Sequence, residues 1–354
     1  MKNKLHFEIE DRKSGPVYLI AEIGINHGGD YALALETIDA AVGAGADAVK
    51  FQSFKADEFM SDKDLLYSYE ENGVVVRESM YDMFKRLELP VEWHMDLKNY
   101  AESKGVDFLS SAADKASANL LVEMGVSAIK LASEDLINYP LLKHIATLGQ
   151  PVILSTGMAE EWEIEKALDE LAAVDVMLLH CVSLYPTPLN QGNLLRIKSL
   201  KKKFGKVVGY SDHTMGIEAA ELAVALGAVC VEKHFTLDRT LPGPDHSFSC
   251  TPDELKELRV RLDRAVDMLG NGAFAPGEEE CKARLDFRRS IVAARPLKAG
   301  TVLSEDDLHL QRPHTGIHPV EMEKLVGRKL SVDVEEREQL SWNFLADDLR
   351  NGQL

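Results

Sequence analysis

Polar side chains recur at the ends of short apolar runs along the first 236 residues of the chain. Each run is rich in Val, Ile, Leu and Phe, and it ends in groups that can carry charge, donate hydrogen bonds or bind a metal ion. A packed core does not need such groups, and burying them without partners is costly. We therefore interpret them as the lining of a functional site.

Two lysines and three serines form the first cluster of candidates: Lys50, Ser111, Lys130, Ser133 and Ser155. Ammonium groups and hydroxyls that face one cavity suit a phosphate or a carboxylate. The alternative is that each serine satisfies a strand end and each lysine pairs with a nearby acid. The recurrence of these residues on successive runs favours an anion-binding site.

Two histidines form the second cluster. His213 and His234 lie at equivalent positions of successive runs, so their imidazoles can reach one divalent ion whose other ligands are water or substrate. A structural pair of core histidines is the alternative, and the spacing alone leaves both interpretations open. His180 lies on an apolar run, and we interpret it as a core residue.

The apolar runs predict eight buried strands, each followed by an amphipathic helix. Such a chain folds as a (β/α)₈ barrel, whose active site lies at the carboxyl ends of the strands. An open doubly wound sheet is the alternative, which the lack of a GxGxxG motif after the first run disfavours. One long interval leaves room for an excursion at about 55–90. The runs are 17–26, 47–54, 106–113, 128–135, 151–157, 176–183, 207–213 and 229–236.

The repeating pattern ends near residue 270. Residues 271–285 are rich in Gly, Pro and Glu, and they predict a linker. Short elements and turns follow. We therefore expect a barrel domain over 1–270 and a separate small domain over 286–354.

Composition excludes several classes of protein. The 354 residues carry 40 Lys and Arg against 58 Asp and Glu, a formal charge of −18, which disfavours binding to nucleic acid. No apolar stretch predicts a membrane helix, and residues 1–15 lack the core of a signal peptide. We expect a cytoplasmic protein whose site, with its lysines, is opposite in charge to the chain as a whole.

The motifs and their order resemble the sialic acid synthase family, which makes N-acetylneuraminate and related nonulosonates. The resemblance runs along essentially the whole chain. It rests on the segments AEIGINHGGD, VKFQ, KLASED followed by NYPLL, ILSTGM, HCVSLYPTP, GYSDHTMG, VEKHFT with GPDHSFS downstream, and RPHTGIHP.

The resemblance implies a (β/α)₈ barrel followed by a β-rich antifreeze-like (SAF) domain. It implies a phosphoenolpyruvate-dependent, C–C bond-forming transferase, which joins phosphoenolpyruvate to an N-acyl hexosamine, typically open-chain N-acetylmannosamine, and releases phosphate. The implied cofactor is a divalent metal ion, commonly Mn²⁺, with Mg²⁺ or Co²⁺ as alternatives. The implied assembly is a domain-swapped homodimer in which the antifreeze-like domain of one chain covers the barrel mouth of the other.

The resemblance also implies roles for single residues. His213 and His234 correspond to the metal ligands, and Glu22 lies near the metal and the sugar. The residues implied to bind phosphoenolpyruvate are Lys50, Ser111, Lys130, Ser133, Ser155 and Ser183. Those implied to bind the sugar are Gln52, Tyr185, Asp245 and Arg312, the last of which reaches the N-acyl group across the dimer.

Three departures from the family pattern qualify these assignments. The family often reads K-x-G-S-G-E where this chain has KLASED, so the family acid falls on Asp135 with Glu134 beside it. The proton-transferring group is left open among Glu134, Asp135 and Glu22. The third run reads SSAAD where S-T-P-F is common, and Ser183 replaces an Asn of some members.

The first two departures are compatible with a different sugar. The sequence thus predicts an N-acetylneuraminate synthase, with a legionaminate or pseudaminate synthase that uses a diacetamido-trideoxyhexose as the alternative. A 3-deoxy sugar acid phosphate synthase lacks the antifreeze-like tail. A non-catalytic sugar-binding protein of polysaccharide assembly is disfavoured because both histidines and both lysines are present.

Overall fold

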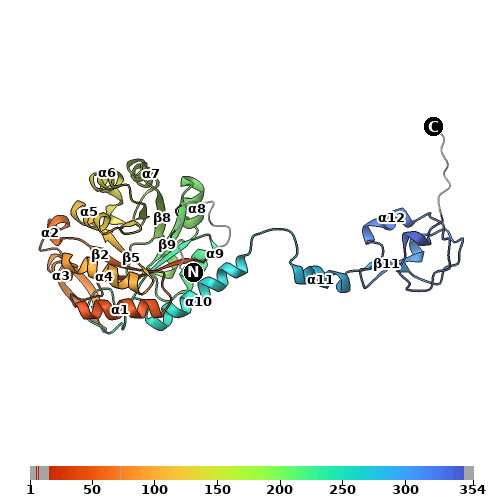
Figure 1. The fold of residues 1–354 in the computed structure, drawn as a ribbon, viewed down its shortest axis with the longest axis horizontal. Helices are drawn as coiled ribbons and strands as arrows, with labels where there is room; N and C mark the ends of the chain where they lie inside the picture. Colours follow the sequence, from red (N-terminus) through yellow and green to blue (C-terminus); the bar gives the residue numbers. More distant parts are fainter. Residues whose placement is uncertain (1–4, 6, 8–15, 72, 347–354) are drawn as a thin grey trace. The chain divides into compact units, whose positions relative to one another are not determined.

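The computed structural model describes residues 5, 7, 16–71 and 73–346 (Figure 1). The chain divides into two compact units, Met1–Asn271 and Gly272–Leu354. The absence of a signal peptide, which was inferred from residues 1–15, concerns a segment that lies largely outside the described residues.

The first unit contains a closed barrel of parallel strands in the order β1-β10-β9-β8-β7-β6-β5-β2. The predicted (β/α)₈ architecture is therefore confirmed, and each predicted run contains one barrel strand. The barrel strands are β1 (Tyr18–Gly24), β2 (Ala48–Ser53), β5 (Asp107–Ala112), β6 (Ile129–Leu131), β7 (Val152–Ser155), β8 (Val176–Cys181), β9 (Val207–Asp212) and β10 (Cys230–His234).

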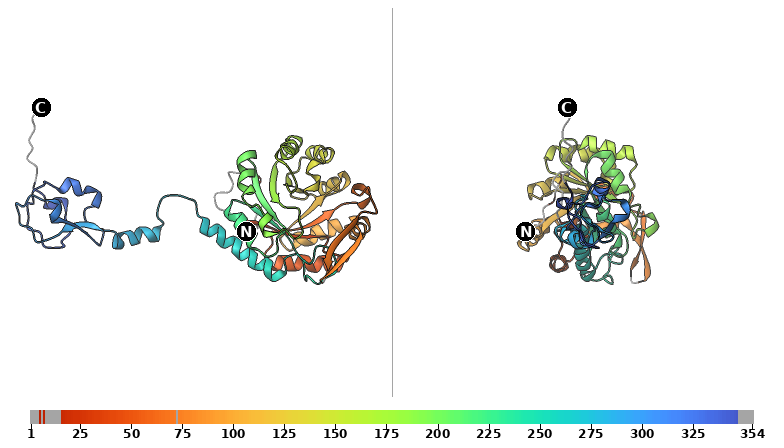
Figure 2. Two further views of the ribbon diagram at one scale, coloured as in Figure 1. Left: turned by 180° about the vertical axis from the view of Figure 1, so that it is seen from behind. Right: turned by 90° about the vertical axis from the view of Figure 1, so that its right-hand side faces the viewer.

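Helices enclose the strands, as the views from the front and from behind show (Figures 1 and 2). Asp30 caps the first helix of the barrel by accepting a hydrogen bond from the Ala32 amide at 2.8 Å, and Thr251 begins the last barrel helix with a capping box. No helix in the described part of the chain has both the length and the apolar character to cross a bilayer. The helices that follow barrel strands are α1 (Tyr31–Gly43), α4 (Val91–Ser103), α5 (Lys115–Glu123), α6 (Tyr139–Leu148), α7 (Glu161–Glu170), α8 (Arg196–Phe204), α9 (Glu218–Ala225) and α10 (Pro252–Leu269), with the short turns η1 (Glu134–Ile137) and η2 (Leu189–Gln191).

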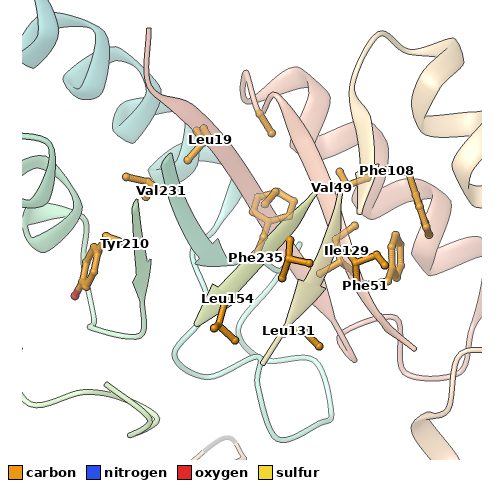
Figure 3. Close-up of a cluster of buried hydrophobic side chains, with 14 of the residues drawn as sticks. Leu19, Val49, Phe51, Phe108, Ile129, Leu131, Leu154, Tyr210, Val231 and Phe235 are labelled. Atoms are coloured by element: carbon orange, nitrogen blue, oxygen red, sulfur yellow. The ribbon is translucent and has the colours of Figure 1, made fainter. Parts of the chain in front are cut away.

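Side chains alternate between two faces of every barrel strand. The outward-facing set, which includes Leu19, Val49, Phe108 and Val231, packs with the apolar faces of the helices in one large core (Figure 3). The inward-facing set fills the barrel near the amino ends of its strands. Its strand members include Ile20, Ala48, Leu109, Ile153, Leu179 and Cys230.

The predicted excursion between β2 and β5 has its own structure. It begins with α2 (Ala56–Phe59) and continues with an antiparallel hairpin of β3 (Leu66–Glu71) and β4 (Val74–Ser79), which leads into α3 (Met80–Leu87). The sequence predicted the place of this excursion but not its structure, because it does not follow the repeat of the barrel.

The second unit has a separate apolar core, which includes Ile291, Leu303, Leu325 and Leu340. Its elements are short, as the sequence predicts for the small domain. A helix also occupies part of the segment predicted as a linker. The elements are α11 (Glu278–Phe287), β11 (Ser290–Ala293), η3 (Glu305–Asp307), β12 (Leu308–Gln311), η4 (Pro319–Glu321), α12 (Met322–Leu325) and η5 (Trp342–Phe344).

Candidate active site

A polar layer lies directly above the apolar filling of the barrel. Each of its members stands two positions after an inward-facing apolar residue, so both point into the barrel. Glu22 follows Ile20 in this way, and Lys50 follows Ala48. A cavity opens at this layer. The candidates that line it are Glu22, Lys50, Gln52, Ser111, Lys130, Ser133, Glu134, Asp135, Ser155, Tyr185, His213 and His234.

The two lysines lie at the floor of the cavity, and both are buried. Lys50 Nζ is 2.8 Å from Glu22 Oε2 and donates to Ser111 Oγ at 3.1 Å. Lys130 Nζ donates to Ser155 Oγ at 2.8 Å. The structure therefore brings the predicted anion-binding lysines and serines together.

Glu232 lies between the two ammonium groups, although it was not among the predicted site residues. Its carboxylate oxygens are 3.6 Å from Lys50 Nζ and 3.8 Å from Lys130 Nζ, and Oε1 accepts from Ser211 Oγ at 2.8 Å. Glu232 and His234 are two residues apart on β10, so strand alternation places them on the same face. This two-residue spacing from His234 is the feature of the sequence from which Glu232 could have been predicted.

The charges in the cavity correct one expectation. The sequence predicted a site opposite in charge to the chain, but Glu22 and Glu232 offset the two lysines. Burial alone would raise the pKa of Glu232, yet the ammonium groups of Lys130 and Lys50 outweigh it and lower the pKa. Burial raises the pKa of Glu22, and it lowers that of Lys130. At the floor of the cavity the buried lysines and glutamates are thus equal in number.

A third lysine, Lys233, belongs to a different environment. It alternates with Glu232 and faces outward, where its Nζ is 2.8 Å from Asp212 Oδ2 and donates to the Thr214 carbonyl at 2.9 Å. The ion pair between Lys233 and Asp212 links β10 to β9, and Lys233 does not line the cavity.

Next to the anion-binding floor, the backbone at Gly157 passes close to the hydroxyls of Ser133 and Ser183. The Gly157 amide donates to Ser133 Oγ at 3.0 Å, and a Cβ at Gly157 would collide with the hydroxyls of Ser133 and Ser183. Only glycine, which has no Cβ, lets the backbone come this close to the two serine side chains. Ser183 Oγ is buried without a hydrogen-bond partner among the described residues. Ser183 is not among the residues that line the cavity, so its contact with phosphoenolpyruvate stays a prediction.

The two predicted metal ligands lie together at the wall of the cavity. The rings of His213 and His234 are 5.4 Å apart between centroids, and Tyr185 stacks on His213 at 4.2 Å. His213 Nδ1 is 2.9 Å from the Val182 carbonyl, so it donates there and leaves Nε2 as the acceptor. His234 Nδ1 is buried without a hydrogen-bond partner among the described residues, and Asp245 Oδ2 lies 3.6 Å from it.

These two imidazoles fit a divalent ion. Burial lowers the pKa of His213 to about 4 and that of His234 well below its ordinary value, so both are neutral near pH 7, as metal ligands must be. Within the described residues no group of three or more His, Cys, Asp or Glu side chains is arranged to hold a metal. An ion here would take its remaining ligands from water or substrate.

The acids that follow β6 lie on one short turn at the cavity. Glu134 and Asp135 belong to η1, and Asp135 Oδ1 accepts from Asn138 Nδ2 at 3.2 Å. Burial raises the pKa of Asp135 to about 7, which suits a group that exchanges protons near neutral pH. Glu22, whose pKa is also raised, stands across the cavity floor.

The predicted sugar-binding residues fall into two groups. Gln52 Nε2 donates to Glu22 Oε1 at 2.9 Å, and it lines the cavity with Tyr185, while Asp245 lies beside His234. Burial raises the pKa of Asp245 to about 7. Arg312 belongs to the second unit, where its guanidinium lies 5.5 Å from the centre of the Phe287 ring, and its contact with a sugar stays a prediction.

One wall of the cavity is apolar and was not predicted. It consists of Phe54, Phe59 and Phe84, which the excursion after β2 contributes, and we call it the aromatic wall. In the sequence Phe54 ends the run 47–54, and Phe59 and Phe84 are isolated aromatics in the excursion. Only the fold of the excursion brings them together.

Comparisons with known proteins find relatives along most of the chain. The NeuB family matches residues 37–274, and the SAF domain matches residues 288–346. An N,N′-diacetyllegionaminic acid synthase from Legionella pneumophila is 40% identical over 335 residues, which cover 93% of this chain and 94% of the relative. The N-acetylneuraminate-9-phosphate synthase of Homo sapiens is 36% identical over 333 residues, which cover 91% and 90%. The crystal structure of an N-acetylneuraminic acid synthetase from Leptospira borgpetersenii in complex with citrate matches with a TM-score of 0.70 at 39% identity, covering 76% of this chain and 90% of the other.

Proposed function

Because the chain belongs to the NeuB family, we propose that it makes a nonulosonate by condensing phosphoenolpyruvate with the open-chain aldehyde of an N-acylated sugar. The observation that carries this proposal is the cavity floor, where two buried lysines with serine partners face two neutral histidines. Phosphoenolpyruvate carries a phosphate and a carboxylate, one anion for each ammonium group. In this proposal the histidines hold the ion that polarises the aldehyde oxygen.

For the sugar, we propose a diacetamido-trideoxyhexose, which makes the product legionaminate. The name of the Legionella relative supports this choice, and so do the KLASED and SSAAD departures from the family pattern. The sequence alone had placed N-acetylmannosamine first. It stays the second candidate because the Leptospira structure, at 39% identity, is of an N-acetylneuraminic acid synthetase.

The reaction consumes one water and releases one phosphate. C3 of phosphoenolpyruvate forms the new bond to the aldehyde carbon, whose oxygen becomes a hydroxyl by taking up a proton. Water adds to C2 and loses one proton. The bond between C2 and the phosphate oxygen then breaks, and the C2 hydroxyl gives its proton to the departing phosphate, which leaves a 2-keto acid. Lys50 and Lys130 hold the two anionic groups, which fixes C3 against the aldehyde.

Substrate binding rearranges the buried charges. Glu22 and Glu232 contact the lysines in the structure described here, so the incoming phosphate and carboxylate compete with them for the ammonium groups. Glu22, whose pKa burial already raises, is placed to take up a proton as this happens. Binding of phosphoenolpyruvate is thus coupled to protonation inside the cavity.

Proton transfer needs a base for the attacking water and an acid for the new hydroxyl. Asp135 suits either step, since its pKa of about 7 gives both protonation states near neutral pH. Glu134 shares its turn, and Glu22 lies across the floor, so all three remain candidates for the base.

We propose that His213 and His234 hold a divalent ion, Mn²⁺ first, with Mg²⁺ and Co²⁺ as alternatives. Such an ion supplies a Lewis acid for the aldehyde oxygen. Tyr185 stacks on His213, and the Val182 carbonyl holds its Nδ1–H. These two contacts orient the His213 ring in the way that partners of metal-binding histidines commonly do.

We expect the chain to act as a homodimer in which Arg312 of one copy reaches the N-acyl group of a sugar bound by the other. Arg312→Ala should then raise the KM for the sugar by at least tenfold and leave the KM for phosphoenolpyruvate unchanged, because in this proposal Arg312 donates to the acyl oxygen of the sugar and does not contact phosphoenolpyruvate. Steady-state kinetics with each substrate varied in turn measures both constants. Equal KM values for the sugar in the two proteins would contradict this role for Arg312.

A substrate panel tests the proposed function directly. The full-length protein is incubated with phosphoenolpyruvate, Mn²⁺ and one sugar at a time, and released phosphate and 2-keto acid are measured. We expect equal amounts of both products, with the diacetamido-trideoxyhexose giving the highest kcat/KM and N-acetylmannosamine a lower one. Omission of the sugar is the control. If no N-acyl sugar releases phosphate, the proposal is wrong.

A further inference from the structure

The aromatic wall is a compact cluster built from three segments of the excursion. Phe54 follows β2, Phe59 ends α2, and Phe84 lies in α3. The ring centroids are 5.5 Å apart for Phe54 and Phe59, 5.4 Å for Phe54 and Phe84, and 5.1 Å for Phe59 and Phe84. All three pairs meet edge to face, which is a favoured geometry for aromatic rings.

This wall offers a ligand only carbon atoms. Ala113, beside it on the cavity lining, adds a methyl group. The charged neighbours in sequence are already engaged: Lys55 Nζ is 3.1 Å from Glu88, and Asp57 is 2.9 Å from Lys85 Nζ. A ligand group that contacts the wall therefore finds a surface for burial and no hydrogen-bond partner in the rings.

Core packing accounts for only part of the cluster. Phe54 is buried and Phe84 packs against the small core of the excursion, but Phe59 is 42% exposed while it lines the cavity. A large apolar side chain that stays exposed at the rim of a polar cavity gains burial when a ligand in the cavity covers it. Phe59 is thus the part of the wall that is available to a substrate.

The aromatic wall and the histidines line the same cavity from different strands. The wall follows β2, whereas His213 follows β9 and His234 ends β10, and in the barrel order β1 lies between β10 and β2. A sugar whose aldehyde lies at the histidines can therefore present its other end, C6, to the wall.

We propose that the aromatic wall receives the terminal methyl group of a 6-deoxy sugar and discriminates against sugars with a terminal hydroxymethyl group. This inference rests on the proposed function and adds a residue, Phe59, that determines specificity. A methyl group gains by leaving water for the phenyl rings, whereas a hydroxyl loses its hydrogen bonds to water and finds none in return. Apolar pockets reject an added hydroxyl by factors of up to about 100.

Two sugars that differ in one atom test this. The probes are 2,4-diacetamido-2,4-dideoxymannose and its 6-deoxy form, each assayed with saturating phosphoenolpyruvate. The wild-type protein is expected to prefer the 6-deoxy sugar in kcat/KM by roughly 10- to 100-fold. Phe59→Ala is expected to bring this ratio close to one without changing the KM for phosphoenolpyruvate, and Phe59→Leu is expected to retain part of the preference.

Trp162→Ala is the matched control. Trp162 is 57% exposed on α7 and does not line the cavity, so its loss removes a similar exposed aromatic and should leave the ratio unchanged. Turnover of both sugars at equal kcat/KM by the wild type overturns the inference and leaves the proposed function standing, as does a wild-type ratio in Phe59→Ala. Failure of the wild type with these two sugars and with N-acetylmannosamine overturns the proposed function itself.

Discussion

Lys130→Met is expected to weaken phosphoenolpyruvate binding by roughly 30- to 4,000-fold while the protein stays folded. The substitution keeps most of the side-chain volume and removes an ammonium group that donates to Ser155 in the buried floor. Loss of one partner of a buried, hydrogen-bonded charge pair costs about 2–5 kcal/mol of binding, which corresponds to that range of affinity. Isothermal titration of the variant with phosphoenolpyruvate measures the change.

Substitution of the two lysines of the floor should affect the free energy of unfolding differently. In Lys130→Met, Glu232 still has Lys50 at 3.6 Å, so the free energy of unfolding should change little. Lys50→Met removes the ion-pair partner that Glu22 has at 2.8 Å, and breaking a buried pair costs roughly 3–5 kcal/mol. Urea unfolding of both variants gives these values.

Lys233→Met is the control for this prediction. Lys233 is as buried as the other two lysines but pairs with Asp212 on the outer face of the strand. Its loss should lower the free energy of unfolding and leave the affinity for phosphoenolpyruvate in the folded protein unchanged. Wild-type affinity in Lys130→Met, or a loss of affinity in Lys233→Met that matches it, would contradict the assignment of the anion-binding floor.

The contrast between Lys50 and Lys233 also shows which features of the barrel can be predicted from the sequence. The eight strands were predictable because strands buried on both faces are apolar throughout. That same continuity hides which face each side chain takes, and Glu232 was therefore not among the predicted site residues. Counting in steps of two from His213 and His234 recovers the inward face, with Ser211 and Glu232 on it.

Two other features depend on the folded chain. The aromatic wall comes from an excursion that interrupts the strand–helix repeat, so no periodic signal places Phe59 at the cavity. The balance of charge comes from contacts between strands that are distant in sequence, such as Glu22 and Glu232 around Lys50. Composition counts these carboxylates in the net charge but does not locate them.

His234→Ala is expected to abolish turnover and to weaken Mn²⁺ binding by more than about 100-fold. Changes to residues that merely orient a metal ligand already cost about 10- to 100-fold in affinity, and here one of two imidazoles is lost. Both rings are neutral near pH 7 because burial lowers their pKa values, so the effect should not depend on protonation. Titration of metal-free protein with Mn²⁺, followed by electron paramagnetic resonance, measures affinity independently of activity.

Because the protein supplies only two of the proposed metal ligands, the affinity for Mn²⁺ should also depend on the sugar. Since no third His, Cys, Asp or Glu joins the pair among the described residues, the wild-type protein should bind Mn²⁺ weakly alone and more tightly when a sugar supplies oxygen ligands. Linkage requires Mn²⁺ to tighten sugar binding by the same factor, and both effects should be lost in His234→Ala.

His180→Asn is the control, because His180 is a buried histidine whose Nε2 is 2.8 Å from the Gly192 carbonyl, outside the cavity lining. Mn²⁺-dependent turnover that survives in His234→Ala, or sugar binding that is indifferent to Mn²⁺ in the wild type, would remove the metal from this site.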